Sequence, residues 1–170
     1  MVLNFQQNLS QALRNIVSKD YQEFIVHGED EARNQINQNQ IFQKYGDYKW
    51  KIIDLLNENY ALFLEEGFDL YNWLNFNPKD EVAYFLAEAG ANAWHYSQYK
   101  APYKYHLWLG EKGFILGIEQ KGAGFQAQEV DEKRIKEGQG AAFRFFRTCK
   151  SQIFFDNPQD AKVVYLQYLF

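Results

Sequence analysis

The sequence YKYHLWLGEKGFILGIEQ, residues 103–120, contains two runs of aromatic and aliphatic residues joined by Gly110-Glu-Lys-Gly113. Runs of this composition on either side of a glycine-bearing turn are typical of a β-hairpin. We therefore predict two antiparallel strands over residues 103–109 and 113–120, connected at the two glycines.

Helices are predicted before this hairpin, and a helix with two further strands after it. Apolar residues three or four apart predict helices over 47–64 and 78–97, the second with Asn77 as N-cap and Pro78 at its first position. After the hairpin we expect a glycine loop over 121–125 and a charged stretch over 128–137. A helix over 141–150 follows, and two strands over 152–155 and 161–169 end the predicted order. This order predicts an α+β two-layer sandwich with helices on one face of a mostly antiparallel sheet.

The N-terminal part is less clearly patterned. We predict a short helix over 4–17 and a strand over 21–27, whereas the polar residues 28–39 fit either a solvated helix or a loop. No composition shift marks a domain boundary. The prediction is a single domain over 1–170, in which 1–46 form an N-terminal extension of unknown role.

Composition excludes several classes of protein. Aromatic residues make up 18% of the 170 residues, which argues against disorder, and the net charge of -4 argues against a nucleic-acid partner. A single cysteine, Cys149, cannot form an internal disulfide. No run approaches the roughly 18 apolar residues of a membrane span. We therefore expect a cytoplasmic protein with no membrane segment, and with Trp50, Trp73, Trp94 and Trp108 in its core.

Three segments carry side chains or glycines suited to a bound ligand. Glu88 and Asn92 are four residues apart in the predicted helix 78–97 and so share one helical face, where a carboxylate and an amide oxygen suit a hydrated magnesium ion. Gly122 and Gly124 allow the backbone to approach a flat or anionic ligand closely. Gly138-Gln-Gly140 precedes a predicted helix, whose free N–H groups favour phosphate. A second interpretation stays open, in which Glu88 and Asn92 are surface residues and the glycines serve only turns.

In this order, the three segments resemble the motifs of the histidine-kinase-type (GHKL) ATPase fold. EAGANAWHYS, from Glu88, is similar to the N box of that family; IEQKGAGF, residues 118–125, is similar to its first glycine box; and GQGAAF, residues 138–143, is similar to its second. The likeness covers residues 78–170, the expected ATPase-like core. Within this family, the chain resembles the small anti-sigma-factor-type serine kinases.

The resemblance implies ATP and Mg²⁺ as cofactors, a regulatory protein as partner, and a possible homodimer. By this resemblance, Glu88 would be the general base or the residue that orients a water, and Asn92 would be the ligand of magnesium-bound ATP. Gln120 stands at the position that reads the adenine, and Gly122 and Gly124 would line the adenine pocket. Gly138 and Gly140 would contact the phosphates. The family has an aspartate at the position of Gln120, a small polar residue at Lys121, and a third glycine where Ala142 stands. These differences favour an alternative function, a degenerate copy of the fold that binds no nucleotide and acts as a protein-interaction module.

Overall fold

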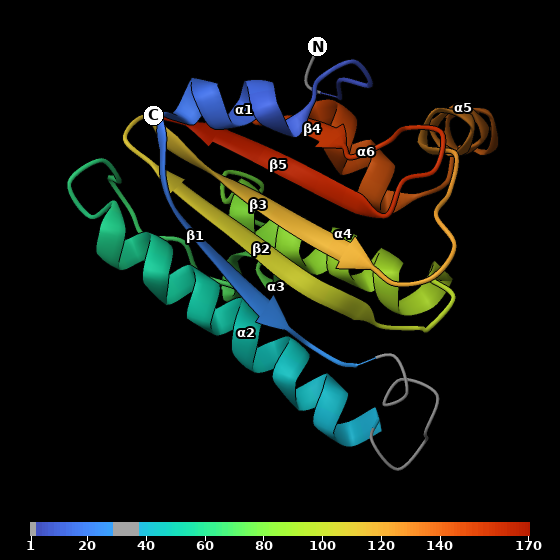
Figure 1. Cartoon of the computed structure of the whole chain (residues 1–170), viewed down its shortest axis with the longest axis horizontal. Helices are drawn as coiled ribbons and strands as arrows, with labels where there is room; N and C mark the ends of the chain where they lie inside the picture. The colour runs from blue at the N-terminus through green and yellow to red at the C-terminus, as the bar shows by residue number, and fades with distance from the viewer. Residues whose placement is uncertain (1–2, 29–37) are drawn as a thin grey trace.

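The computed structural model describes residues 3–28 and 38–170, which form an α+β sandwich built on one antiparallel sheet (Figure 1). The strand order is β1-β2-β3-β5-β4, and each neighbouring pair is antiparallel. The strands are β1 Ser18–Ile25, β2 Pro102–Gly110, β3 Gly113–Gln120, β4 Gln152–Phe155 and β5 Val163–Leu169. The predicted fold class is confirmed.

The hairpin of β2 and β3 forms as predicted. Gly110 and Gly113, however, are not required there for an unusual backbone conformation. Neither is among the glycines with positive φ. A Cβ on Gly110 would lie 2.2 Å from the carbonyl oxygen of Ile16, and one on Gly113 would lie 1.9 Å from that of Tyr168. The Tyr60 hydroxyl also binds this turn, 2.9 Å from Gly110 O and 3.0 Å from Gly113 O. The glycines therefore allow neighbouring backbone to pack against the hairpin.

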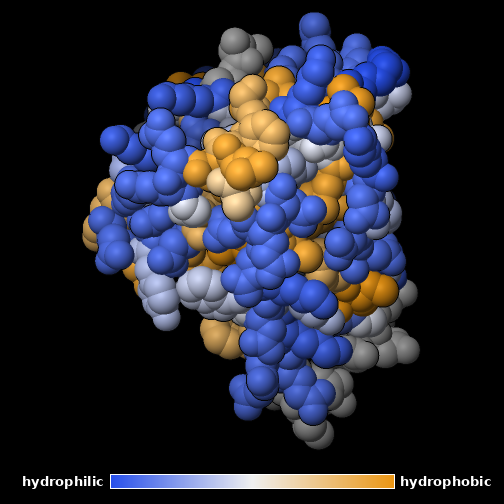
Figure 2. Space-filling view, turned by 90° about the vertical axis from the view of Figure 1, so that its left-hand side faces the viewer, coloured by the Kyte–Doolittle hydropathy of each residue, from blue (hydrophilic) through white to orange (hydrophobic). Residues whose placement is uncertain are grey.

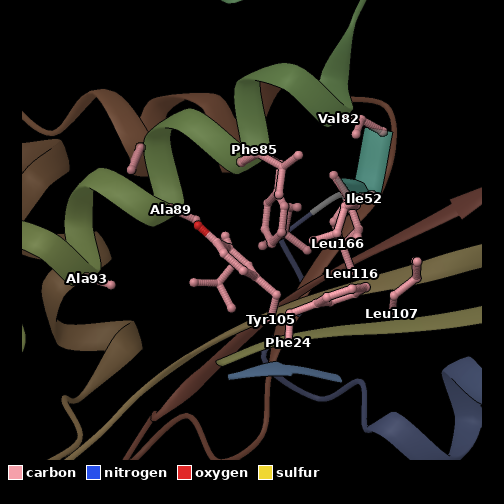
Figure 3. Close-up of a cluster of buried hydrophobic side chains, with 14 of the residues drawn as sticks. Phe24, Ile52, Val82, Phe85, Ala89, Ala93, Tyr105, Leu107, Leu116 and Leu166 are labelled. Atoms are coloured by element: carbon pink, nitrogen blue, oxygen red, sulfur yellow. The ribbon is translucent and has the colours of Figure 1, made fainter. Parts of the chain in front are cut away.

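Three of the described helices cover one face of the sheet. They are α2 Gln38–Asn59, α4 Glu81–Tyr96 and α6 Ala141–Thr148. Figure 3 shows the core beneath α4, where Phe85 and Ala89 face Tyr105 and Leu116 of the sheet. All four side chains are almost fully buried. Burial of this apolar surface fixes the height and rotation of α4, which carries the predicted site residues.

The opposite face carries a smaller core, beneath α1 Leu9–Ile16. Ala12 and Ile16 of α1 pack there against Ile115, Phe154 and Tyr165. The helices on one face were predicted, whereas α1 adds partial cover to the other (Figure 1). Together, α1 and β1 place much of the predicted N-terminal extension inside the sandwich. The undecided segment 28–39 falls almost wholly outside the described residues.

The bounds predicted for the helices over 78–97 and 47–64 are wrong. The N-cap of α4 is Asp80, whose Oδ1 accepts from Ala83 N at 2.9 Å, while the Asn77 side chain accepts from Lys79 N in the preceding turn. Pro78 consequently lies before the helix. The predicted helix 47–64 is α2, which begins at Gln38 and ends at Asn59. Tyr60 follows it and turns inward to bind the hairpin, so the amphipathic pattern continues beyond the helix.

The prediction that all four tryptophans lie in the core is also wrong. Trp50 is 38% exposed and Trp73 is 36% exposed, while Trp94 and Trp108 are partly buried. The exposed pair occurs on α2 and on the short helix α3 Tyr71–Leu74, where both rings are partly open to solvent. In the part of the chain that the structure describes, no helix has the length and apolar character needed to cross a membrane.

Cys149 is buried at the end of α6, where burial and the nearby Glu81 carboxylate raise the pKa of its thiol to about 12. At mildly alkaline pH we expect the folded protein to react with a disulfide reagent on the order of 1,000-fold more slowly than the unfolded chain, whose thiol pKa is about 8.5. The raised pKa in the folded state stabilises the fold below about pH 8.5, and this contribution is lost as pH rises towards the folded value. Thiol titration with and without denaturant measures the difference. Rapid reaction of the folded protein would contradict the burial.

Candidate functional site

The three predicted segments meet around one pocket with a volume of about 690 Å³. Its lining includes five of the predicted site residues, namely Glu88, Asn92, Gln120, Gly124 and Gly140. Gly122 and Gly138 do not line it. The volume is within the range of small-molecule and cofactor sites. The lining also includes the aromatic side chains of Phe125 and Phe143.

α4 contributes one wall of the pocket. Glu88 and Asn92 both line it, as expected for residues one helical turn apart, and the same face continues to His95 and Tyr96. The Glu88 Oε1 atom accepts a hydrogen bond from Trp73 Nε1 at 3.0 Å. The buried side of α4 anchors this wall to the sheet, so that the polar pair is held at the pocket.

The loop after β3 contributes a second wall, and hydrogen bonds fix its shape. Gln120 Nε2 donates to the carbonyl oxygen of Ala123 at 2.9 Å, and the backbone N–H of Ala123 donates to Gln98 Oε1 at 2.9 Å. Because a carbonyl oxygen only accepts, this bond sets the orientation of the Gln120 amide. Gln120 Oε1 is thereby left as the acceptor side of the amide that lines the pocket.

The two glycines of this loop have different surroundings. Gly122 has φ 90°, and a Cβ there would lie 2.2 Å from Gln98 Oε1. It therefore shapes the loop from outside the pocket. Gly124 lines the pocket, and a Cβ on it would lie 2.7 Å from the backbone carbon of Asp160. Both positions require glycine to keep the loop folded against its neighbours.

The start of α6 contributes a third wall. Gly140, with φ 87°, is its N-cap, and no side chain caps the helix. Ala141 and Ala142 also line the pocket, so the first free N–H groups of the helix lie beside it. Such a helix start favours an anion. Gly138 instead ends the preceding helix in a left-handed conformation, with open space around it.

That preceding helix, α5 Ala127–Glu137, carries Val130 and Arg134 into the pocket lining. The Arg134 guanidinium lies 5.6 Å from the centre of the Tyr96 ring, and a Cβ on Gly140 would lie 2.9 Å from its Cδ. Arg134 therefore connects the walls formed by α4 and α6. An ion pair between Asp131 and Arg147 fastens α5 to α6. Arg134 supplies positive charge to a pocket whose other charged wall residue is Glu88.

Several lining residues were not predicted as site residues. His95 and Tyr96 occur three and four positions after Asn92, so helical spacing alone indicated that they share its face. Gln139 lies within the predicted Gly138-Gln-Gly140 segment, whereas Gln98 has no such local signal, because it lies in the turn that follows α4. The contact of Trp73 with Glu88 depends on how α3 packs against α4, which sequence spacing does not reveal.

The donor set limits how a metal ion can bind. Within residues 3–28 and 38–170, no group of three or more His, Cys, Asp or Glu side chains is placed to hold a metal ion. Asn92 and Glu88 supply only one amide and one carboxylate. Such a set suits Mg²⁺ that is bound mainly through ligand phosphates and water, with one or two protein oxygens.

Comparison of the chain with protein-family models, with curated proteins and with solved structures finds no match.

Proposed function

We propose that the chain is an ATP-binding regulatory protein, similar in kind to an anti-sigma-factor-type serine kinase. The observation that carries this proposal is the convergence of residues from three separate segments. Glu88 and Asn92 of α4, Gln120 and Gly124 after β3, and Gly140 before α6 line one pocket of about 690 Å³. The resemblance in sequence implies such a shared pocket, and the shape of the fold supports it.

The proposed roles follow the chemistry of each wall. Gln120 Oε1 would accept a hydrogen bond from the adenine amino group, since its amide nitrogen is engaged with Ala123. The uncapped start of α6 and the Arg134 guanidinium would bind the phosphates. Asn92 would provide an oxygen to Mg²⁺, which neutralises phosphate charge when bound. Glu88 Oε2 would accept the proton of the attacking oxygen, from a partner's serine hydroxyl in phosphoryl transfer or from water in hydrolysis, as that oxygen bonds to the γ-phosphorus and ADP leaves.

A titration with magnesium-bound ATP tests the proposal. Binding should raise the free energy of unfolding by about 2.7 kcal/mol when the free nucleotide is a hundred-fold above its Kd. Calorimetry and thermal unfolding measure the affinity and the stabilisation. The absence of any shift in stability at millimolar nucleotide would reject the proposal.

The Asn92→Ala variant tests the assigned magnesium ligand. We expect it to abolish the magnesium-dependent part of the nucleotide signal, because the amide oxygen at the proposed metal position is lost. Asn59→Ala is a matched control at the exposed end of α2, where the amide bonds only its own helix, and it should titrate as the wild type does. Unchanged magnesium dependence in Asn92→Ala would reject the assignment.

A second candidate function, a protein-interaction module, is favoured by exposed apolar residues at one end of the molecule. Figure 2 shows apolar residues gathered there within a polar surface. The chain end reaches this region in Figure 1, and Phe63 and Phe170 stack there with ring centres 5.1 Å apart. Leu62 is 97% exposed. The nucleotide titration separates the two functions, because a degenerate module predicts no response to ATP.

A further inference from the structure

The Glu88 carboxylate is hydrogen-bonded to a residue outside the pocket. Trp73 Nε1 donates a hydrogen bond to Glu88 Oε1 at 3.0 Å, and Trp73 is not among the residues that line the pocket. Among the described residues, Trp73 is the hydrogen-bond partner of the Glu88 side chain. Trp73 can therefore act on a ligand in the pocket through Glu88 without touching the ligand.

The position of Trp73 is set by the attachment of α3 to α4. Asp80 Oδ2 accepts from the backbone N–H of Asp69 and from Asn72 Nδ2, both at 2.8 Å. The other oxygen of the same carboxylate caps α4 through Ala83 N. The segment that carries Trp73 is thus fastened at the start of α4, and the Trp73–Glu88 bond fastens it again about two turns further along.

The indole N–H suits the task of holding a general base. It donates a hydrogen bond and cannot accept a proton, so it does not compete with the carboxylate for the proton to be transferred. It occupies Oε1 and leaves Oε2 to accept from a water or a hydroxyl. A long acidic side chain at a pocket edge has several rotamers, and a fixed donor selects one of them before the ligand binds.

We propose that Trp73 is a positioning residue that holds Glu88 in the orientation required for proton transfer. This inference rests on the proposed function, because Glu88 needs a reacting ligand in order to act as a base. The segment is otherwise turned outwards: Tyr71 and Leu74 are each 57% exposed and Phe76 is 85% exposed. The indole of Trp73 is the group through which α3 reaches the pocket residues.

The test is a comparison of Trp73→Phe with the wild type in steady-state ATP hydrolysis, with binding of magnesium-bound ATP measured separately. Phe keeps an aromatic ring and removes the N–H donor. We expect kcat to fall about tenfold while KM and Kd stay within about twofold, since only the orientation of the base changes. Trp50→Phe is the matched control: Trp50 is similarly exposed, and its ring contacts Tyr71 rather than a pocket residue. It should leave kcat unchanged.

A double variant and an NMR measurement complete the test. Trp73→Phe combined with Glu88→Gln should lose no more activity than Glu88→Gln alone, because both changes act on one group. The indole N–H resonance of Trp73 should shift in Glu88→Gln. These readouts respond to the hydrogen bond itself and not to general packing.

The outcomes separate this inference from the proposed function. ATP binding with an unchanged kcat in Trp73→Phe would overturn the inference and leave the proposed function standing. Binding without any hydrolysis by the wild type would overturn the roles of both Glu88 and Trp73. A joint fall in Tm, affinity and kcat would make Trp73 a packing residue and would also overturn the inference. Absence of ATP binding would reject the proposed function together with the inference.

Discussion

The Gly113→Ala variant is expected to lose about 3–5 kcal/mol of the free energy of unfolding. Gly113 begins β3 and is paired with Leu169 of β5. A Cβ there would lie 1.9 Å from the carbonyl oxygen of Tyr168 and 3.1 Å from the Cα of Leu169. Backbone atoms of a central strand cannot move aside as a side chain can. The variant must therefore separate β3 from β5 at this end or disrupt the hairpin turn.

Gly46→Ala is the matched control for this substitution. Gly46 lies within α2, and a Cβ on it would meet nothing within 4 Å. Because alanine has the higher helix propensity, we expect this variant to be up to about 1 kcal/mol more stable than the wild type. Urea unfolding of both variants measures the effects. Equal stability of the two variants would contradict the close approach of β3 and β5.

The Glu81→Ala variant is expected to lose about 3–5 kcal/mol, for a reason unrelated to steric overlap. Glu81 is 7% exposed, and its carboxylate accepts from the Lys150 N–H, from the Ser151 N–H at 2.9 Å and from the Ser151 hydroxyl at 2.5 Å. It thereby joins the first turn of α4 to the turn between α6 and β4. Alanine leaves the two Ser151 donors buried without this partner, and each unsatisfied buried donor is costly.

Two further variants make the Glu81 measurement specific. Glu58→Ala removes an exposed acidic side chain from α2 and should change stability by less than about 0.5 kcal/mol. Glu81→Gln keeps the shape of the side chain and one acceptor oxygen. Its loss of free energy of unfolding should therefore lie between the losses of Glu58→Ala and Glu81→Ala. Denaturant titration at constant pH gives the three free energies. A small effect of Glu81→Ala would show that water replaces the carboxylate, and would contradict the burial.

Much of the sheet could be predicted because its signals are local. The runs on either side of the Gly110–Gly113 turn have strand composition, and the strand predicted over 152–155 matches the bounds of β4. The cap of α4 could not be chosen from sequence, because Asn77 and Asp80 are both good N-cap residues. Packing decides between them: Asp80 also accepts hydrogen bonds from Asp69 and Asn72. That contact depends on the tertiary position of α3.

The candidate site divides in the same way. Glu88 and Asn92 lie at one wall because helical spacing alone puts them on one face. The glycines were identified as a group, yet their roles differ: Gly124 and Gly140 line the pocket, whereas Gly122 and Gly138 shape the backbone outside it. Sequence shows that a glycine is present but not which neighbour requires it. Trp73 was missed because its partner is determined by the packing of two helices.

The burial of Cys149 makes the chain well suited to site-specific labelling. Cys149 is the single cysteine of the sequence, and its thiol is both hidden and held in the unreactive protonated form. A cysteine introduced at Lys133, whose side chain is 69% exposed on α5, would then be the one site that a maleimide dye or spin label modifies. The label would report directly whether α5 changes position over the pocket when ATP is added, without any prior removal of the native thiol.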